Sequence, residues 1–65
     1  MAVITVPKNI RESGRLRVQE TASAVEALIE AARNDRRQII VLHEANGEEI
    51  RIRWSLIQAV ERRYP

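Results

Sequence analysis

Few residues of this chain have the types and spacing that catalysis requires. His43 is the only histidine, Asp35 is the only aspartate, and cysteine is absent. General acid–base chemistry would fall to Glu44, Glu48 or Glu49, which flank a predicted turn and are typical of a solvated rim. We therefore expect no catalytic residue, and we expect that the protein is not an enzyme.

The sequence also offers few residues that could bind a metal or a cofactor. The single histidine has no second ligand at a spacing that would favour zinc. Gly14 and Gly47 stand alone, so no glycine-rich loop is available to hold a phosphate. We expect no metal and no cofactor.

Arginine offers the clearest binding chemistry. Lys8 is the only lysine among 11 basic residues. Forked guanidinium groups bind phosphate or carboxylate well, although a GC-rich genome would also favour arginine over lysine. The net charge is only +2, which is too small to indicate a nucleic-acid-binding protein by itself.

Size limits what the chain can bury. The 65 residues, 45% hydrophobic and 31% charged, suit one folded domain spanning 1–65. A domain this small buries only about 60% of its unfolded surface. Without cysteine, neither disulfides nor thiolate zinc sites can add stability, so tight packing or association with another chain must do so.

Localisation is predicted from what the sequence lacks. The longest apolar run, 39–42, is too short to cross a bilayer, and the N-terminus has no signal-peptide pattern. We expect a cytoplasmic protein.

The N-terminal part predicts a β-hairpin. Residues 2–6 form a short, mostly apolar segment that predicts a strand. Pro7 ends this strand because proline cannot donate to a β-ladder. Residues 8–14 are polar and predict a loop. Residues 15–18 alternate charged and apolar side chains, which indicates a second strand with one wet face.

Residues 20–33 predict the clearest helix. Ser23 and Glu26 have the spacing of a capping box, and Thr21 is a competing N-cap. The predicted buried stripe comprises Ala22, Val25, Leu28, Ile29 and Ala32.

The C-terminal part predicts a second hairpin and an ambiguous tail. Residues 38–43 form a branched apolar strand, an Asn-Gly turn follows, and 49–54 alternate cleanly. Residues 55–65 fit either a helix or a turn at 55–57 followed by a strand over 58–63, and the turn and strand are favoured. The fold class is thus α+β, ββαββ(β), with an antiparallel or mixed sheet and one helix packed on one face.

The arginines are predicted to gather on the sheet face that the helix leaves uncovered. The expected partner- or anion-binding residues are Arg15, Arg17, Arg51, Arg53, Arg62 and Arg63. They favour a phosphate backbone or an acidic protein partner. The alternative is a solvated face on which the arginine stems cover apolar area and the heads pair with nearby glutamates.

The apolar strand 39–42 supplies side chains to both of its faces, and one helix covers only one of them. We therefore expect a homo-oligomer, with Ile40, Leu42, Trp54 and Tyr64 as possible interface residues.

Residues 3–12, Val-Ile-Thr-Val-Pro-Lys-Asn-Ile-Arg-Glu, resemble the start of an AbrB-type swapped-hairpin DNA-binding domain. The resemblance covers about a sixth of the chain and implies a DNA-binding dimer using Lys8 and Arg11. The family continues with strands, whereas this chain enters an alanine-rich helix.

The element order is similar to that of β-grasp, ubiquitin-like domains, including sulfur carriers. Those carriers end in Gly-Gly and this chain ends Arg-Arg-Tyr-Pro, so a conjugating role is not implied. The spacing Gly47-x-x-Ile50-x-Ile52, then Ile57 and Val60-Glu61, also resembles small uncharacterised proteins of actinobacteria and their phages.

Together these features predict a small non-catalytic interaction module, homo-oligomeric and with an unidentified protein partner, consistent with a phage or mobile-element accessory protein. The alternative is an AbrB-like DNA-binding transcriptional regulator that uses Lys8, Arg11 and the arginine-rich sheet face, so nucleic acid is a second possible partner. No membrane partner is expected.

Overall fold

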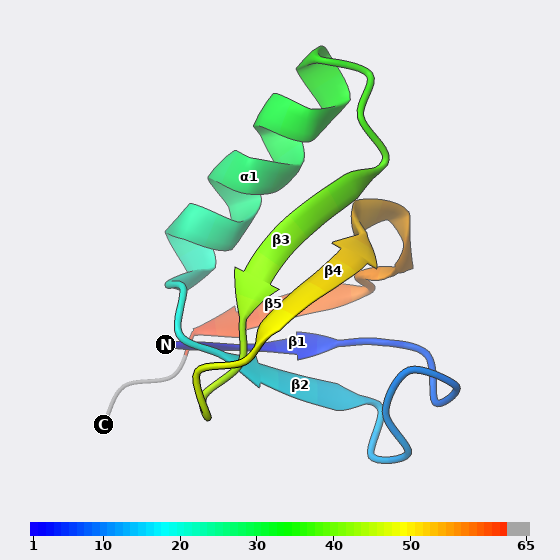
Figure 1. The fold of residues 1–65 in the computed structure, drawn as a ribbon, viewed down its shortest axis with the longest axis vertical. Helices are drawn as coiled ribbons and strands as arrows, with labels where there is room; N and C mark the ends of the chain where they lie inside the picture. Colours follow the sequence, from blue (N-terminus) through cyan, green and yellow to red (C-terminus); the bar gives the residue numbers. More distant parts are fainter. Residues whose placement is uncertain (63–65) are drawn as a thin grey trace.

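The computed structural model describes residues 1–62, which form five strands, one α-helix and one 3-10 turn (Figure 1). In chain order the elements are β1 (Ala2–Thr5), β2 (Arg15–Val18), α1 (Ala22–Asn34), β3 (Ile39–His43), β4 (Glu49–Arg53), the 3-10 turn η1 (Trp54–Leu56) and β5 (Ala59–Arg62). This order confirms the predicted α+β fold. It also decides the ambiguous tail in favour of a turn followed by a strand.

β1 is the centre of a three-stranded antiparallel sheet with the order β2-β1-β5. Ile4 lies opposite Leu16 on one side and opposite Val60 on the other. The loop between β1 and β2 closes where Gly14 takes a φ of +70° and its carbonyl accepts a 2.9 Å hydrogen bond from the Val6 N–H. Glycine is suited to this position because L side chains are strained at positive φ.

β3 and β4 form a separate antiparallel hairpin in which Ile40 faces Ile52 and Leu42 faces Ile50. The connecting turn places Gly47 at a φ of +92°, and the Glu44 N–H donates to the Glu48 carbonyl at 2.8 Å. This three-residue loop, a turn ending in a left-handed glycine, confirms the hairpin that the Asn-Gly pair predicted.

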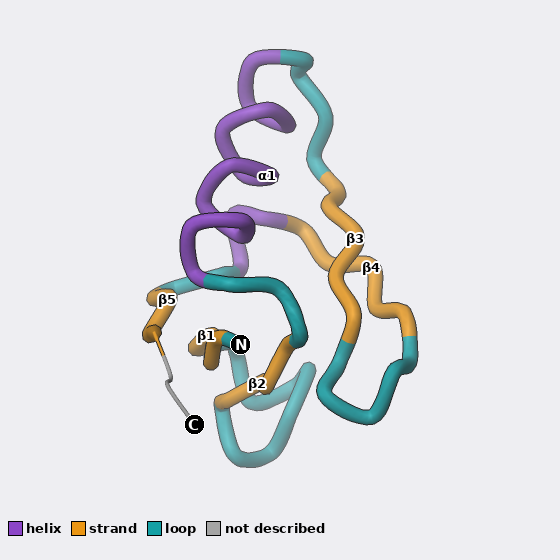
Figure 2. The backbone as a smooth tube through the Cα atoms, turned by 90° about the vertical axis from the view of Figure 1, so that its left-hand side faces the viewer, coloured by secondary structure: helices purple, strands orange, loops and turns teal. Residues whose placement is uncertain are grey.

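The two sheets join at one corner. Val18 and Glu44 form an isolated antiparallel bridge, and the Gln19 N–H donates to the His43 carbonyl at 2.8 Å. The strands of the hairpin run obliquely to those of the three-stranded sheet, and α1 lies beside β3 and above β5 (Figures 1 and 2). The sheets and the helix therefore enclose one common core.

Both ends of α1 are capped. The Thr21 hydroxyl accepts a hydrogen bond from the Ala24 N–H at 3.1 Å, so Thr21 rather than Ser23 is the N-cap. At the C-terminus, Arg36 takes a φ of +58° and donates to the Arg33 carbonyl, while the Arg37 N–H donates to the Ala32 carbonyl. This pair of bonds is a Schellman motif with arginine at the position that usually holds glycine.

The core is apolar throughout residues 1–62, where no polar or charged residue is buried. Its largest fully buried side chains come from β1, β2, α1 and β3. The predicted helical stripe is wrong at Leu28, which is 37% exposed, because it lies at the flank of the buried face rather than at its centre. In the part of the chain that the structure describes, no helix is long and apolar enough to cross a membrane.

Candidate interaction surface

The outward side of β3 carries large apolar side chains in contact with solvent. Ile39 is 45% exposed and Val41 is 38% exposed. The prediction that Ile40 and Leu42 form an interface is corrected here, because these residues are 4% and 0% exposed and belong to the core. Side chains alternate across a strand, so the pair that faces Ile50 and Ile52 is buried and the other pair projects outward.

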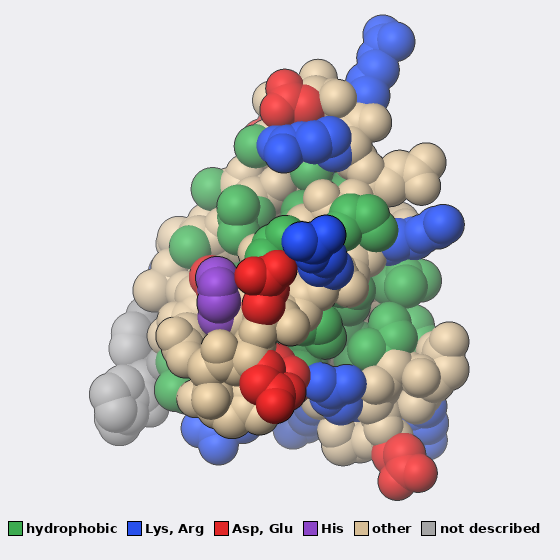
Figure 3. Space-filling model, viewed as in Figure 1, with side chains coloured by type: hydrophobic (Ala, Val, Ile, Leu, Met, Phe, Trp, Pro, Cys, Tyr) green, Lys and Arg blue, Asp and Glu red, His purple; other side chains and the backbone are tan. Residues whose placement is uncertain are grey.

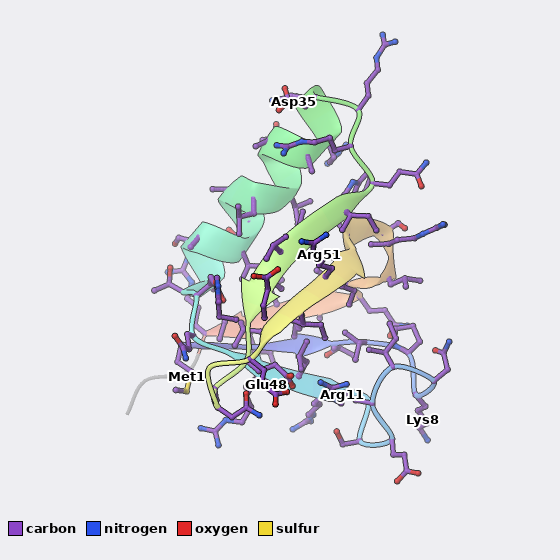
Figure 4. The ribbon with its side chains drawn as sticks, in the orientation of Figure 1. Met1, Lys8, Arg11, Asp35, Glu48 and Arg51 are labelled. Carbon is purple, nitrogen blue, oxygen red and sulfur yellow. The ribbon has the colours of Figure 1, made fainter. Side chains whose placement is uncertain are left out.

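The antiparallel register places a polar side chain of β4 next to each outward side chain of β3. Its cross-strand pairs define what we call the hairpin outer face: Ile39 with Arg53, Val41 with Arg51, and His43 with Glu49. Arg51 Nε lies 3.4 Å from a carboxylate oxygen of Glu49, and both side chains are largely exposed. Arg51 projects from the near side of the hairpin in Figure 4.

The apolar part of this surface continues onto α1. Leu28 is exposed, and so is Ala31, one helical turn further along; Ala27, which is also exposed, lies one turn before Ala31. Hydrophobic side chains lie along the helix and reach the hairpin in Figure 3, where charged and histidine side chains border them. Three of the four exposed large hydrophobic residues among residues 1–62 thus belong to β3 and α1.

One end of the hairpin outer face is held in place by Glu20. One carboxylate oxygen accepts a 2.9 Å hydrogen bond from the His43 backbone N–H, and the other lies 2.7 Å from His43 Nδ1. Burial acts to raise the pKa of Glu20, but the hydrogen bonds from the His43 side chain and backbone outweigh it and hold that pKa below its ordinary value of 4.5. Glu20 therefore fixes the helix entry to the end of β3 as an anion.

The predicted single arginine face is divided in two. Arg15 and Arg17 lie on β2, in the three-stranded sheet, whereas Arg51 and Arg53 lie on the hairpin. Each pair points away from the core because the alternate residues of its strand point into it. Arg62 is exposed on β5, and the predicted sites at Arg63 and Tyr64 lie outside the described residues.

The residues of the DNA-binding alternative lie in the loop between β1 and β2. Arg11 Nη2 is 2.5 Å from Glu44 Oε1, and its other terminal nitrogen donates to the Ile10 carbonyl at 3.0 Å. Lys8 is exposed at the outer part of the loop (Figure 4). Arg11 therefore holds the loop against the start of the hairpin turn, while Lys8 extends into solvent.

Trp54 connects the hairpin to the end of the helix. Its Nε1–H donates to the Arg37 carbonyl at 2.8 Å, and the Arg33 guanidinium carbon lies 5.7 Å from the ring centroid. The half-buried ring packs against the core cluster. Trp54 thus joins two elements within one chain.

Sequence reasoning missed the contribution of Glu20 and the outward position of Ile39 and Val41. Glu20 and His43 are 23 positions apart in the chain, and nothing local pairs them. The local turn signal did not settle the orientation of β3, because a two-residue Asn-Gly turn would pair Val41 with Ile52, whereas the observed three-residue loop pairs Ile40 with Ile52. Within residues 1–62, no three His, Asp or Glu side chains gather in a way that could hold a metal ion.

Comparisons with known proteins found no matching family, no similar curated protein and no similar solved structure.

Proposed function

We propose that this chain is a small non-catalytic interaction module that self-associates. We propose further that it binds a protein partner through the hairpin outer face. The observation that supports this proposal is the exposure of Ile39 and Val41 beside Arg51 and Arg53. A central apolar strip with arginine at its border is the composition that protein interfaces favour.

The chemistry of this face favours a partner with both apolar and acidic groups. Arg51 and Arg53 are the two positive charges of β4, and of the two only Arg51 has a carboxylate of residues 1–62 within ion-pair distance. A partner carboxylate opposite Arg53 would form a forked, charge-assisted pair. An aliphatic partner side chain would cover Ile39 or Val41.

DNA binding is the competing proposal, and the exposure of Lys8, Arg15 and Arg17 supports it. Arg11 supports it less, because Glu44 already pairs with its guanidinium group. Phosphate contacts would make binding fall steeply with salt, by a factor of roughly ten or more for each few-fold rise in concentration if several phosphates are neutralised.

A photo-crosslinking amino acid placed at position 39 tests the protein-binding proposal in cells that express the chain. We expect a covalent adduct with one defined protein, and we expect Arg51→Glu with Arg53→Glu to abolish it. The matched control places the same crosslinker at position 15, on the outer side of the three-stranded sheet, where no such adduct is expected.

The opposite pattern would overturn the proposal. Adducts from position 15 but not from position 39 would assign binding to the other sheet. A duplex-DNA mobility shift that is lost at high salt and lost with Lys8→Ala, Arg15→Ala and Arg17→Ala would favour the DNA-binding alternative.

A further inference from the structure

The outer edge of β4 presents unpaired backbone groups. In the hairpin, the Trp54 N–H donates to the Gln38 carbonyl, and the Glu44 N–H donates to the Glu48 carbonyl. Antiparallel pairs alternate between bonded and non-bonded positions. The N–H and C=O groups of Ile50 and Ile52 therefore point toward β3, and those of Glu49, Arg51 and Arg53 point away from it.

Nothing in residues 1–62 pairs with these outward groups. β3 is the only strand hydrogen-bonded to β4, and no loop or side chain donates to or accepts from the backbone of Glu49, Arg51 or Arg53. Figure 1 shows β4 as the outer strand of its hairpin. An unpaired strand edge is a ready template for another strand.

The sequence of β4 is complementary to itself when reversed. In an antiparallel pairing of two copies centred on Arg51, Glu49 of each copy lies opposite Arg53 of the other, and Ile50 lies opposite Ile52. The outward groups of Glu49, Arg51 and Arg53 then meet each other at bonded positions. Opposite charges directly across an antiparallel pair are stabilising.

One like-charged contact remains in this register. Arg51 of each copy lies opposite Arg51 of the other at the two-fold axis. The Glu49 carboxylate, 3.4 Å from Arg51 Nε within the same chain, offsets part of that repulsion.

We propose that the chain forms a two-fold dimer in which β4 pairs with β4 of a second copy, so that two hairpins become one four-stranded sheet. This proposal rests on the proposed function, because it identifies the self-association contact. It leaves the hairpin outer face uncovered and places two copies of Ile39 and Val41 on one continuous sheet face. The dimer thus builds a larger binding surface than either chain has alone.

Charge exchange between positions 49 and 53 tests the register. A short edge contact supports a weak dimer, so sedimentation velocity is measured from roughly 10 µM to roughly 1 mM. Glu49→Arg or Arg53→Glu alone places like charges opposite each other twice, and we expect the dissociation constant to rise by about tenfold or more. The double variant Glu49→Arg, Arg53→Glu restores opposite charges and is expected to return within about threefold of the wild type.

Substitution of Arg51 provides an independent check with the opposite sign. Arg51→Thr removes the repulsion at the two-fold axis, so we expect dimerisation to become about two- to fivefold tighter. If Arg51 instead faced a carboxylate of the second copy, the same substitution would weaken the dimer. Circular dichroism and urea unfolding confirm that each variant is folded.

The outcomes separate the edge contact from the proposed function. A wild-type chain that stays monomeric to about 1 mM, or a folded double variant that fails to recover dimerisation, overturns the edge proposal. Loss of dimerisation with Ile39→Thr and Val41→Thr but not with the charge changes would place self-association on the hairpin outer face instead. The adduct formed from position 39 of the otherwise unsubstituted chain tests partner binding separately from either result.

Discussion

At the scale of single residues, Arg36 has an unfavourable backbone conformation. It is the only residue other than glycine with positive φ among residues 1–62, at +58°. Replacing it with glycine removes a clash between Cβ and the backbone, so we expect Arg36→Gly to raise the free energy of unfolding by about 0.5–1 kcal/mol. Urea unfolding measures the change. Asn34→Gly, two positions earlier and within the helix, is the matched control and is expected to lower the stability by a similar amount.

Glu20 gives the protein a pH-dependent stability. Because its pKa is lowered in the folded state, the carboxylate stabilises the fold above its ordinary value of 4.5, and this contribution disappears as pH falls through the lower, folded-state pKa. We expect Glu20→Gln to lower the free energy of unfolding by about 1 kcal/mol at pH 7. The difference should shrink progressively in unfolding experiments below pH 4.5. An equal difference at pH 7 and at acid pH would contradict the role of Glu20 as an anion.

At the scale of elements, the orientation of β3 is tested by two neighbouring residues. Ile39→Thr changes an outward side chain, and we expect the stability to stay within about 0.5 kcal/mol. Ile40→Thr places a hydroxyl in the core and removes buried apolar volume, so we expect a loss of about 2 kcal/mol or more. Equal effects in urea unfolding would mean that the assigned face of β3 is wrong.

Trp54 tests the connection between the hairpin and the helix. Trp54→Phe keeps an aromatic ring but removes the N–H that donates to the Arg37 carbonyl at 2.8 Å. We expect the free energy of unfolding to fall by about 1 kcal/mol. Unfolding followed by circular dichroism is suitable because the substitution also removes the only tryptophan. No change would indicate that solvent replaces this bond without cost.

The predictability of these elements depended on how each pattern alternates. The charged and apolar residues of 15–18 and 49–53 alternate strictly, so the sequence predicted both strands and their buried faces. Residues 39–42 are all apolar, so their own pattern could not say which pair was buried. The length of the turn decides it: the observed three-residue loop sets Ile40 opposite Ile52, whereas a two-residue Asn-Gly turn would set Val41 there.

At the scale of the whole molecule, the predicted α+β fold class was confirmed. The predicted gathering of the arginines on one sheet face was wrong. The prediction assumed one sheet, whereas a single bridge between Val18 and Glu44 joins two. Long-range geometry of this kind has no local signal. The same geometry separates Arg15 and Arg17 from Arg51 and Arg53.

Backbone amide exchange as a function of protein concentration tests the central claim most directly, because it reports which surface of the intact chain becomes covered. We predict that the amides of Glu49, Arg51 and Arg53 exchange freely at low concentration and become protected as concentration rises, while the amides of β2 do not change. Protection that instead appears on Arg15–Val18, or that is independent of concentration at every residue of β4, would contradict the pairing of β4 with β4 of a second copy.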